Sequence, residues 1–236
     1  MRKTIVATAL IAALPLIGTA HAEETSPFSA NIGFVSDYAY RGISQTNERA
    51  AVQGGFDYAH DSGFYAGVWG TNISWLADAN DDVSSSLEVD FYAGYAKEFG
   101  DFGVDVGLLQ YVYPGSYPHG FNDPNTLEGY VGLSWKFVSF KYSQSFTDLF
   151  GTEDSKGSQY LDLSASYEII DGLSLDAHYG RQRITGPAKS YADWKVGATY
   201  NFKGFDIGLH YVDTDMKDKD DFDADARYIL SVSKSF

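Results

Sequence analysis

The feature that most constrains this chain is a period-two alternation of apolar and polar residues that recurs from Phe28 to the C-terminus. Between Leu87 and Tyr95, for example, every second residue is apolar, and Glu88 and Asp90 stand among the residues between them. Such alternation predicts strands that are wet on one face. Twelve segments show it, each long enough to cross a bilayer as a tilted strand: 28–40, 50–60, 63–75, 86–98, 102–113, 125–136, 138–147, 158–169, 173–184, 190–202, 205–213 and 225–236.

The connections between these segments alternate between short and long. The short ones are 60–63, 100–101, the break near Phe137, 170–172 and 203–204, and the long ones are 41–49, 76–85, 114–124, 148–157, 185–189 and 214–224. An antiparallel barrel in the outer membrane has this asymmetry, with tight periplasmic turns and longer external loops, whereas a soluble sandwich with Greek-key crossovers does not require it. We therefore predict an all-β fold, a single antiparallel transmembrane β-barrel of twelve strands.

Aromatic side chains gather beside the short connections, as Phe99 and Phe102 do around 100–101. Rings at strand ends form the interfacial girdle of membrane barrels, although aromatics are also good strand formers in general. The chain ends on Phe236, and this ending resembles the C-terminal insertion signal that the barrel assembly machinery recognises, with Lys234 where an apolar residue is usual. The expected partners are therefore that machinery, outer-membrane lipid and lipopolysaccharide.

The first 22 residues have the layout of a cleaved secretory signal. Arg2 and Lys3 precede an apolar run that is too short for a spanning helix, and small residues end at Ala22, the predicted cleavage site. The domains expected are thus the signal peptide, 1–22, and the barrel, 23–236, in the bacterial outer membrane. The chain has no Cys, which excludes thiolate metal sites and thiol nucleophiles, and its net charge of −15 argues against nucleic acid.

The N-terminal part of the mature chain carries two specific blocks, Ser36-Asp37-Tyr38-Ala39-Tyr40-Arg41-Gly42-Ile43-Ser44-Gln45-Thr46 and Gln53-Gly54-Gly55-Phe56-Asp57-Tyr58. In this order they resemble the TorF-type putative porin family of proteobacteria. The resemblance is sharp over 29–74 and continues as strand spacing over the rest. It implies an outer-membrane barrel, and it supplies no established substrate or functional residues.

Assigning the apolar face of each strand to lipid leaves a charged face for the lumen. Eleven acids then point inward against five fixed cations, so the lumen carries an excess of negative charge that favours cations if water reaches it. The candidate pore-lining residues are Asp37, Arg41, Asp57, Glu88, Asp90, Asp105, Glu128, Lys141, Asp162, Asp176, Asp193, Lys195, Asp206 and Arg227. The remaining inward charges are Glu168 and Lys136, with His178 and His210 beside them.

Arg41 follows Asp37 on the expected first strand and opens the first external loop. We hypothesise that Arg41 pairs with a lumen acid and narrows the outer mouth, the alternative being an Arg at the rim that reaches into water. The sequence then predicts a porin-like channel for passive diffusion of small solutes, cations among them. A closed structural or surface-binding barrel without conductance is the alternative, followed by a barrel hydrolase and a soluble secreted sandwich.

Metal and catalytic sites find little support in the sequence. The acidic loop 213–225 fails the EF-hand pattern, because Asp218 stands where Gly is needed and Ala224 where Glu belongs. Ser231 and Lys234 have a nucleophile spacing but lie on an expected strand, and no His has a partner spacing that certifies a triad. We expect no catalytic residues, no metal and no cofactor, and therefore no enzyme.

Overall fold

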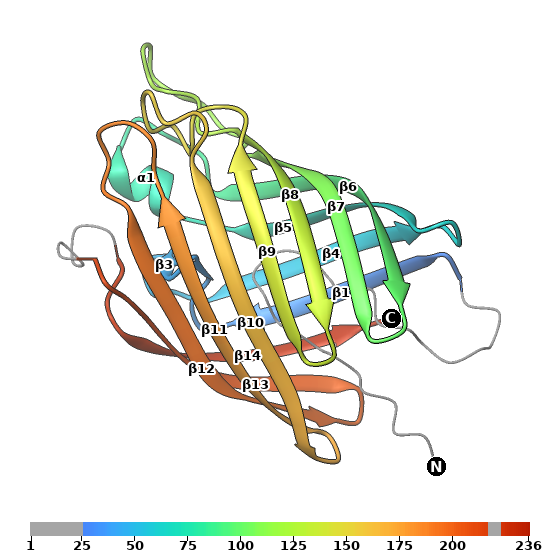
Figure 1. Ribbon diagram of the computed structural model, residues 1–236. Helices are drawn as coiled ribbons and strands as arrows, with labels where there is room; N and C mark the ends of the chain where they lie inside the picture. Colours follow the sequence, from blue (N-terminus) through green and yellow to red (C-terminus); the bar gives the residue numbers. More distant parts are fainter. Residues whose placement is uncertain (1–25, 217–222) are drawn as a thin grey trace.

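Twelve antiparallel strands close into one barrel in the computed structural model, which describes residues 26–216 and 223–236. Each strand pairs with its neighbour along the chain, and β1 closes the barrel by pairing with β14 (Figure 1). The predicted fold class is thereby confirmed. The barrel strands are β1 Phe28–Val35, β4 Ala51–Ala59, β5 Phe64–Asn72, β6 Leu87–Phe99, β7 Phe102–Val112, β8 Thr126–Trp135, β9 Val138–Ser145, β10 Gln159–Ile170, β11 Leu173–Arg183, β12 Tyr191–Phe202, β13 Phe205–Thr214 and β14 Arg227–Ser235.

The strand faces differ as the alternation predicts. In β10, Leu161 and Leu163 are 41% and 51% exposed, whereas Asp162 between them is 2% exposed. The outer surface is therefore a continuous apolar band, and the polar side chains point into the barrel. Exposed apolar area of this extent marks a surface that contacts lipid or protein rather than water.

Short and long connections occupy opposite ends of the barrel, which we call the short-turn end and the long-loop end (Figure 1). The turn between β12 and β13 consists of Lys203 and Gly204, both with positive φ (53° and 82°), which is the type I′ geometry that joins tightly paired strands. A short helix, α1 Trp75–Ala79, lies in a long loop. Among the described residues, no helix is both long and apolar enough to cross a membrane.

Inward tyrosines pack over glycines of the neighbouring strand. Tyr92 stands opposite Gly67 in the register, and Tyr130 stands opposite Gly107. A Cβ atom at either glycine would collide with the facing tyrosine ring or hydroxyl. These glycines therefore make room for large rings on the inner wall, which fill the lumen without widening the barrel.

The first strand is shorter than predicted. The expected strand 28–40 ends at Val35, and residues 36–50, which we call the lumen hairpin, turn into the barrel instead of continuing along its wall. Two short strands, β2 Ala39–Tyr40 and β3 Ile43–Ser44, pair within this segment. The period-two pattern extends past Val35 because β2 is itself extended, so the alternation could not mark the change of direction. For the same reason the prediction of an external loop at 41–49 is wrong for residues 41–46, which lie inside the barrel, whereas residues 47–49 are exposed.

Candidate functional site

The lumen hairpin folds on itself around Asp37. The hydroxyls of Ser44 and Thr46 donate to Oδ1 of Asp37 at 2.5 and 3.0 Å, and the amide of Gln45 donates to the carbonyl of Tyr38 at 2.7 Å. Its tip is a two-residue turn in which Arg41 and Gly42 both have positive φ, 48° and 82°. Residues at such a tip point away from the hairpin, so Arg41 projects toward the barrel wall.

Arg41 contacts three strands of the wall from this position. Its Nη2 donates to both carboxylate oxygens of Glu128 on β8, at 2.7 and 3.0 Å, and its Nη1 donates to Oε1 of Gln182 on β11 at 2.7 Å. The guanidinium carbon lies 4.3 Å from the ring centre of Tyr160 on β10 and 4.8 Å from that of Tyr40. Burial lowers the pKa of Arg41, but the Glu128 carboxylate together with nearby Tyr40 and Tyr111 raises that pKa above its ordinary value.

A second arginine–carboxylate pair joins the hairpin to the wall, with the arginine on the wall and the carboxylate on the hairpin. Arg227 belongs to the wall strand β14, and its Nε donates to Oδ2 of Asp37 at 2.5 Å. Its two Nη atoms donate to the carbonyls of Gly42 and Asp225 at 3.0 and 2.6 Å. Both arginine–carboxylate pairs are almost wholly buried, so neither is screened by water as a surface pair would be.

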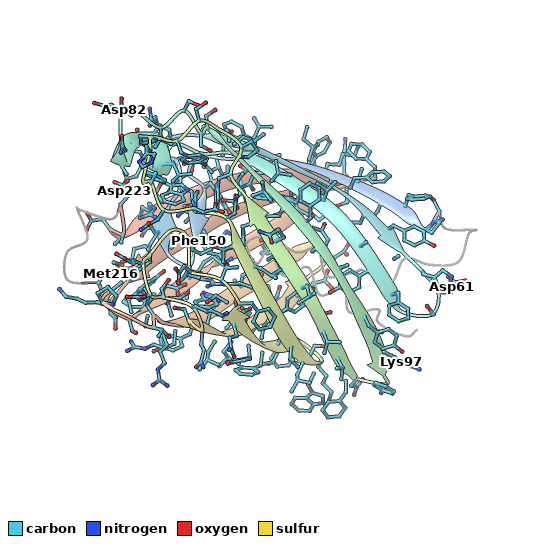
Figure 2. The ribbon with its side chains drawn as sticks, turned by 90° about the horizontal axis from the view of Figure 1, so that it is seen from above. Asp61, Asp82, Lys97, Phe150, Met216 and Asp223 are labelled. Atoms are coloured by element: carbon cyan, nitrogen blue, oxygen red, sulfur yellow. The ribbon has the colours of Figure 1, made fainter. Side chains whose placement is uncertain are left out.

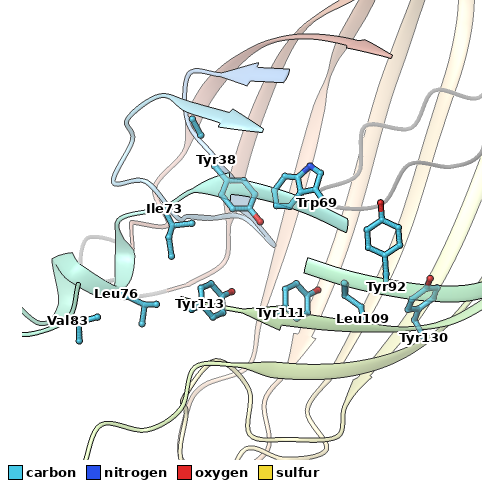
Figure 3. Close-up of a cluster of buried hydrophobic side chains, with 11 residues drawn as sticks. Tyr38, Trp69, Ile73, Leu76, Val83, Tyr92, Leu109, Tyr111, Tyr113 and Tyr130 are labelled. Carbon is cyan, nitrogen blue, oxygen red and sulfur yellow. The ribbon is translucent and has the colours of Figure 1, made fainter. Parts of the chain in front are cut away.

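Aromatic side chains of the wall cluster with Tyr38 of the lumen hairpin (Figure 3). The ring of Tyr38 packs on Trp69 with centres 5.7 Å apart, and its hydroxyl donates to Glu88 at 2.8 Å. The hydroxyls of Tyr40 and Tyr111 share a hydrogen bond of 2.6 Å. Glu88, Tyr38 and Tyr111 are buried, and together with Trp69 they leave little room for water at the long-loop end of the lumen.

Asp90 differs from the neighbouring acids because no described residue donates a hydrogen bond to its carboxylate. It is 0% exposed, and neither carboxylate oxygen has a hydrogen-bond partner in the described part of the chain. The residues opposite it on the adjacent strands are Trp69 and Tyr111. A buried carboxylate in such surroundings is costly to keep ionised.

The middle of the lumen holds ion pairs that include two histidines. His178 lies between Asp193 (2.9 Å) and Asp162 (3.4 Å), and His210 lies 3.0 Å from Asp176. Ser164 Oγ is 3.1 Å from Nδ1 of His178 but also donates to Asp162 at 2.7 Å. Because the one hydroxyl proton of Ser164 is donated to Asp162, it is not directed at His178 as the serine of a catalytic triad would require.

The short-turn half of the lumen is more open. There the predicted lining residues Asp57, Asp105, Asp176 and Asp206 are only partly buried, whereas Glu88, Asp90, Glu128, Asp162 and Asp193 are all buried. Tyr65 donates to Asp105 at 2.6 Å, and Tyr92 donates to Asp57. A cavity of about 260 Å³ at this end is lined by Glu168, Asp171, Gly172, Ser174, Thr199, Asn201 and Asp206.

Figure 2 shows the same asymmetry, with side chains gathered toward the end marked by Asp82, Asp223 and Met216 and fewer inside near Asp61 and Lys97. The remaining lumen cations are half-buried on the inner face: Lys141, 5.6 Å from the ring centre of Tyr130, and Lys195. Lys136 is different from expectation, since it lies exposed in the turn between β8 and β9.

The structure therefore brings the predicted residues into one lumen but divides them into two zones. Arg41, Asp37, Arg227 and Glu128 join hairpin to wall, and the less buried acids line the short-turn half. Sequence reasoning missed Gln182 and Tyr160, which contact Arg41, and Tyr38, whose hydroxyl donates to Glu88. The one signal for the hairpin in the sequence was Gly42, because a glycine between extended residues fits the second central position of a type I′ turn.

Several predictions concern other parts of the chain. The signal peptide 1–22 and its cleavage site at Ala22 lie outside the described residues, as does much of the acidic loop, 217–222. Phe236 is 70% exposed, and its backbone pairs with Ala30. In the described residues, no group of three or more His, Cys, Asp or Glu side chains is placed to hold a metal ion.

The comparisons place this barrel in a family. The chain belongs to the family described as bacterial protein of unknown function (Gcw_chp), whose model matches residues 19–236. The finer resemblance to TorF-type porins stays a prediction. No curated protein matches the chain.

Solved porin structures share the fold. The KdgM porin is 12% identical with a TM-score of 0.55, and the match covers 88% of this chain and 99% of that one. The KdgM porin in complex with disordered oligogalacturonate is likewise 12% identical, with a TM-score of 0.56 and coverages of 88% and 99%. The NanC porin is 14% identical with a TM-score of 0.54 and coverages of 89% and 98%. At this identity the likeness shows the fold alone.

Proposed function

We propose that this protein is an outer-membrane channel for passive diffusion of small solutes, with a preference for cations, and that the lumen hairpin closes its outer end. Strands that are apolar outside and polar inside support a membrane location, because lipid requires an apolar face and a closed hydrogen-bond ladder. In that orientation the short turns face the periplasm and the long loops face outward. Lipid and lipopolysaccharide then contact the outer face, and the barrel assembly machinery is the proposed partner during insertion.

The observation that carries the proposal is the contrast between the two halves of the lumen. The short-turn half is lined by partly exposed acids such as Asp57, Asp105 and Asp206, which attract cations into water-filled space. The long-loop half is filled by the lumen hairpin and its buried ion pairs. We therefore expect a passage at the short-turn end, with the lumen hairpin rather than the wall blocking the other end.

Cation preference follows from charge and distinguishes this lumen from one suited to polyanions. The name of one KdgM structure records oligogalacturonate, an acidic polymer, as its ligand. Here the lumen residues of the short-turn half are mainly acids, and Lys141 is the nearest inward cation in the described wall between Asp105 and Asp162. A polyanion would meet repulsion on this path.

A closed structural barrel is the second candidate, and the burial of both arginine pairs favours it. The two candidates differ in whether the hairpin leaves the lumen. Ion selectivity tests the channel directly. In planar bilayers under a salt gradient, a chain whose residues 37–49 are replaced by a Gly-Ser linker of equal length should show a cation-selective reversal potential.

A matched pair of double variants locates the source of this selectivity. In the linker chain, Asp57→Asn with Asp105→Asn should reduce the reversal potential, because these side chains face the lumen. Asp61→Asn with Asp101→Asn removes the same charge from the adjacent exposed turns and should change it little. Anion selectivity, or an equal effect of both pairs, would contradict the proposed preference.

A further inference from the structure

We propose that Glu128, Tyr160 and Gln182 form a binding site on the barrel wall for guanidinium groups of solutes, which Arg41 occupies while the lumen hairpin is in place. The proposal rests on the proposed function in one respect, namely that solutes reach the lumen. The proposal extends that function by naming guanidinium compounds as the solutes that the lumen binds most specifically. Arg41 is then a tethered ligand as well as part of the closure.

The contacts to the guanidinium come mainly from the wall. Glu128 lies on β8, Tyr160 on β10 and Gln182 on β11, and only Tyr40 belongs to the hairpin. Glu128 accepts two hydrogen bonds (2.7 and 3.0 Å), Gln182 accepts one (2.7 Å), and the Tyr160 ring covers the guanidinium at 4.3 Å. A carboxylate, an amide oxygen and an aromatic face are the three partners that a planar guanidinium uses together.

Bonds within the wall hold these three side chains without help from the hairpin. The Tyr160 hydroxyl donates to Asp193 at 3.0 Å, and Gln182 Nε2 donates to the carbonyl of Gln159 at 3.2 Å. Glu128 Oε2 lies 3.4 Å from the hydroxyl of Tyr111 on β7. With the hairpin in place Glu128 and Gln182 are each 2% exposed, and removal of the Arg41 guanidinium leaves Oε1 of Glu128 and Oε1 of Gln182 without the donors they have now. A preorganised site with unsatisfied acceptors binds a matching donor strongly.

The geometry selects guanidinium over ammonium. The Nη atoms of Arg41 reach two different acceptors in directions set by one plane, and the ring stacks on that plane. An ammonium ion is a compact point charge that meets Glu128 but does not bridge to Gln182 and stack at the same time. Arginine and short arginine-containing peptides are solutes of the class that fits.

Arg227 provides a contrast within the same chain. Its partners are the Asp37 carboxylate and the carbonyls of Gly42 and Asp225, which belong to the hairpin or to a loop rather than to wall strands. Removal of Arg227 therefore leaves no set of wall side chains arranged for a guanidinium. The Arg227→Ala variant is the matched control for Arg41→Ala.

Calorimetric titration of the folded full chain in detergent with methylguanidinium and methylammonium tests the site. Arg41→Ala should bind methylguanidinium saturably and about tenfold more tightly than methylammonium. The natural chain should show no such binding, and Arg227→Ala, in which Arg41 still competes for the site, should bind methylguanidinium more weakly than Arg41→Ala. Adding Glu128→Gln to Arg41→Ala should abolish it. Equal affinity for the two cations, or binding that survives Glu128→Gln, would overturn the proposal.

A second measurement covers the case in which Arg41→Ala folds poorly. Methylguanidinium should then raise the refolding yield of Arg41→Ala, measured by heat-modifiable gel mobility, while methylammonium at equal concentration should not. No difference between the two would also overturn the proposal. Both readouts are independent of conductance. A silent bilayer would refute the proposed channel and leave the guanidinium site standing. Absent binding would refute the guanidinium site and leave the channel standing.

Discussion

Replacing Arg227 by Met should release the lumen hairpin from the wall while leaving the barrel folded. Removal of one partner from a buried ion pair costs about 3–5 kcal/mol because the other charge stays buried. Asp37 keeps its hydrogen bonds from Ser44 and Thr46, at 2.5 and 3.0 Å, so we expect the lower end, about 3 kcal/mol. That free energy corresponds to a roughly hundredfold increase in the open population of the hairpin.

Hydrogen exchange at the amide of Gln45 reads this opening, because that amide donates to Tyr38 within the hairpin at 2.7 Å. Its exchange should accelerate roughly a hundredfold in Arg227→Met, while amides in the barrel strands keep their protection. Arg49→Met is the matched control. Arg49 pairs with Asp78 at 3.1 Å, with side chains 63% and 36% exposed, and such a surface pair contributes less than about 1 kcal/mol.

A double-mutant cycle separates the ion pair from lost packing. Asp37→Asn combined with Arg227→Met should cost less than the sum of the single changes, because no charge is then left buried alone. The reasoning would be refuted if Arg227→Met accelerated exchange at Gln45 no more than Arg49→Met does, or if the two single changes were simply additive.

Three further predictions address the barrel itself. Asp90→Leu should raise the free energy of unfolding, measured by urea titration, by about 1–4 kcal/mol, because it removes a buried carboxylate with no hydrogen-bond partner in the described chain. A lower free energy of unfolding would instead indicate a cation or water bound to Asp90. Gly107→Val should lower that free energy by about 1–3 kcal/mol, since its side chain would collide with Tyr130, and an unchanged value would show that the ring can move. Leu163→Arg should lower the free energy of unfolding in lipid by about 2–4 kcal/mol, and Ile169→Arg, nearer the strand end, should lower it by about 0–1 kcal/mol. Equal losses would argue against a bilayer around these residues.

The fold was predictable because period-two alternation and connection length are local properties of the sequence. A strand such as 158–169 carries its own signal, with Leu161 and Leu163 outward and Asp162 inward, and the structure places it at Gln159–Ile170. Short turns such as Lys203-Gly204 fix which neighbours pair. Antiparallel neighbours then leave little freedom in strand order, so the barrel follows from many independent local signals.

The site was predictable only in its residue types. The sequence indicated that Arg41 faces lumen acids, but its partner Glu128 lies 87 residues away, and which acid it meets depends on how the closed barrel aligns β8 with the hairpin. The inward turn at Ser36 was not predictable from alternation, because β2 has the same extended backbone as the strand it follows. The uncompensated Asp90 depends on packing by Trp69 and Tyr111, which the register brings together.

The most direct test of the central claim compares the single-channel conductance of the intact chain with that of the chain whose residues 37–49 are replaced by a linker. Heat-modifiable gel mobility first shows that both chains are folded. The intact chain should be silent or open rarely, the linker chain should conduct in discrete steps, and Arg227→Met should open more often than the intact chain. A linker chain that is folded but silent, or an intact chain that conducts as well as the linker chain, would contradict the claim that the lumen hairpin closes an otherwise open barrel.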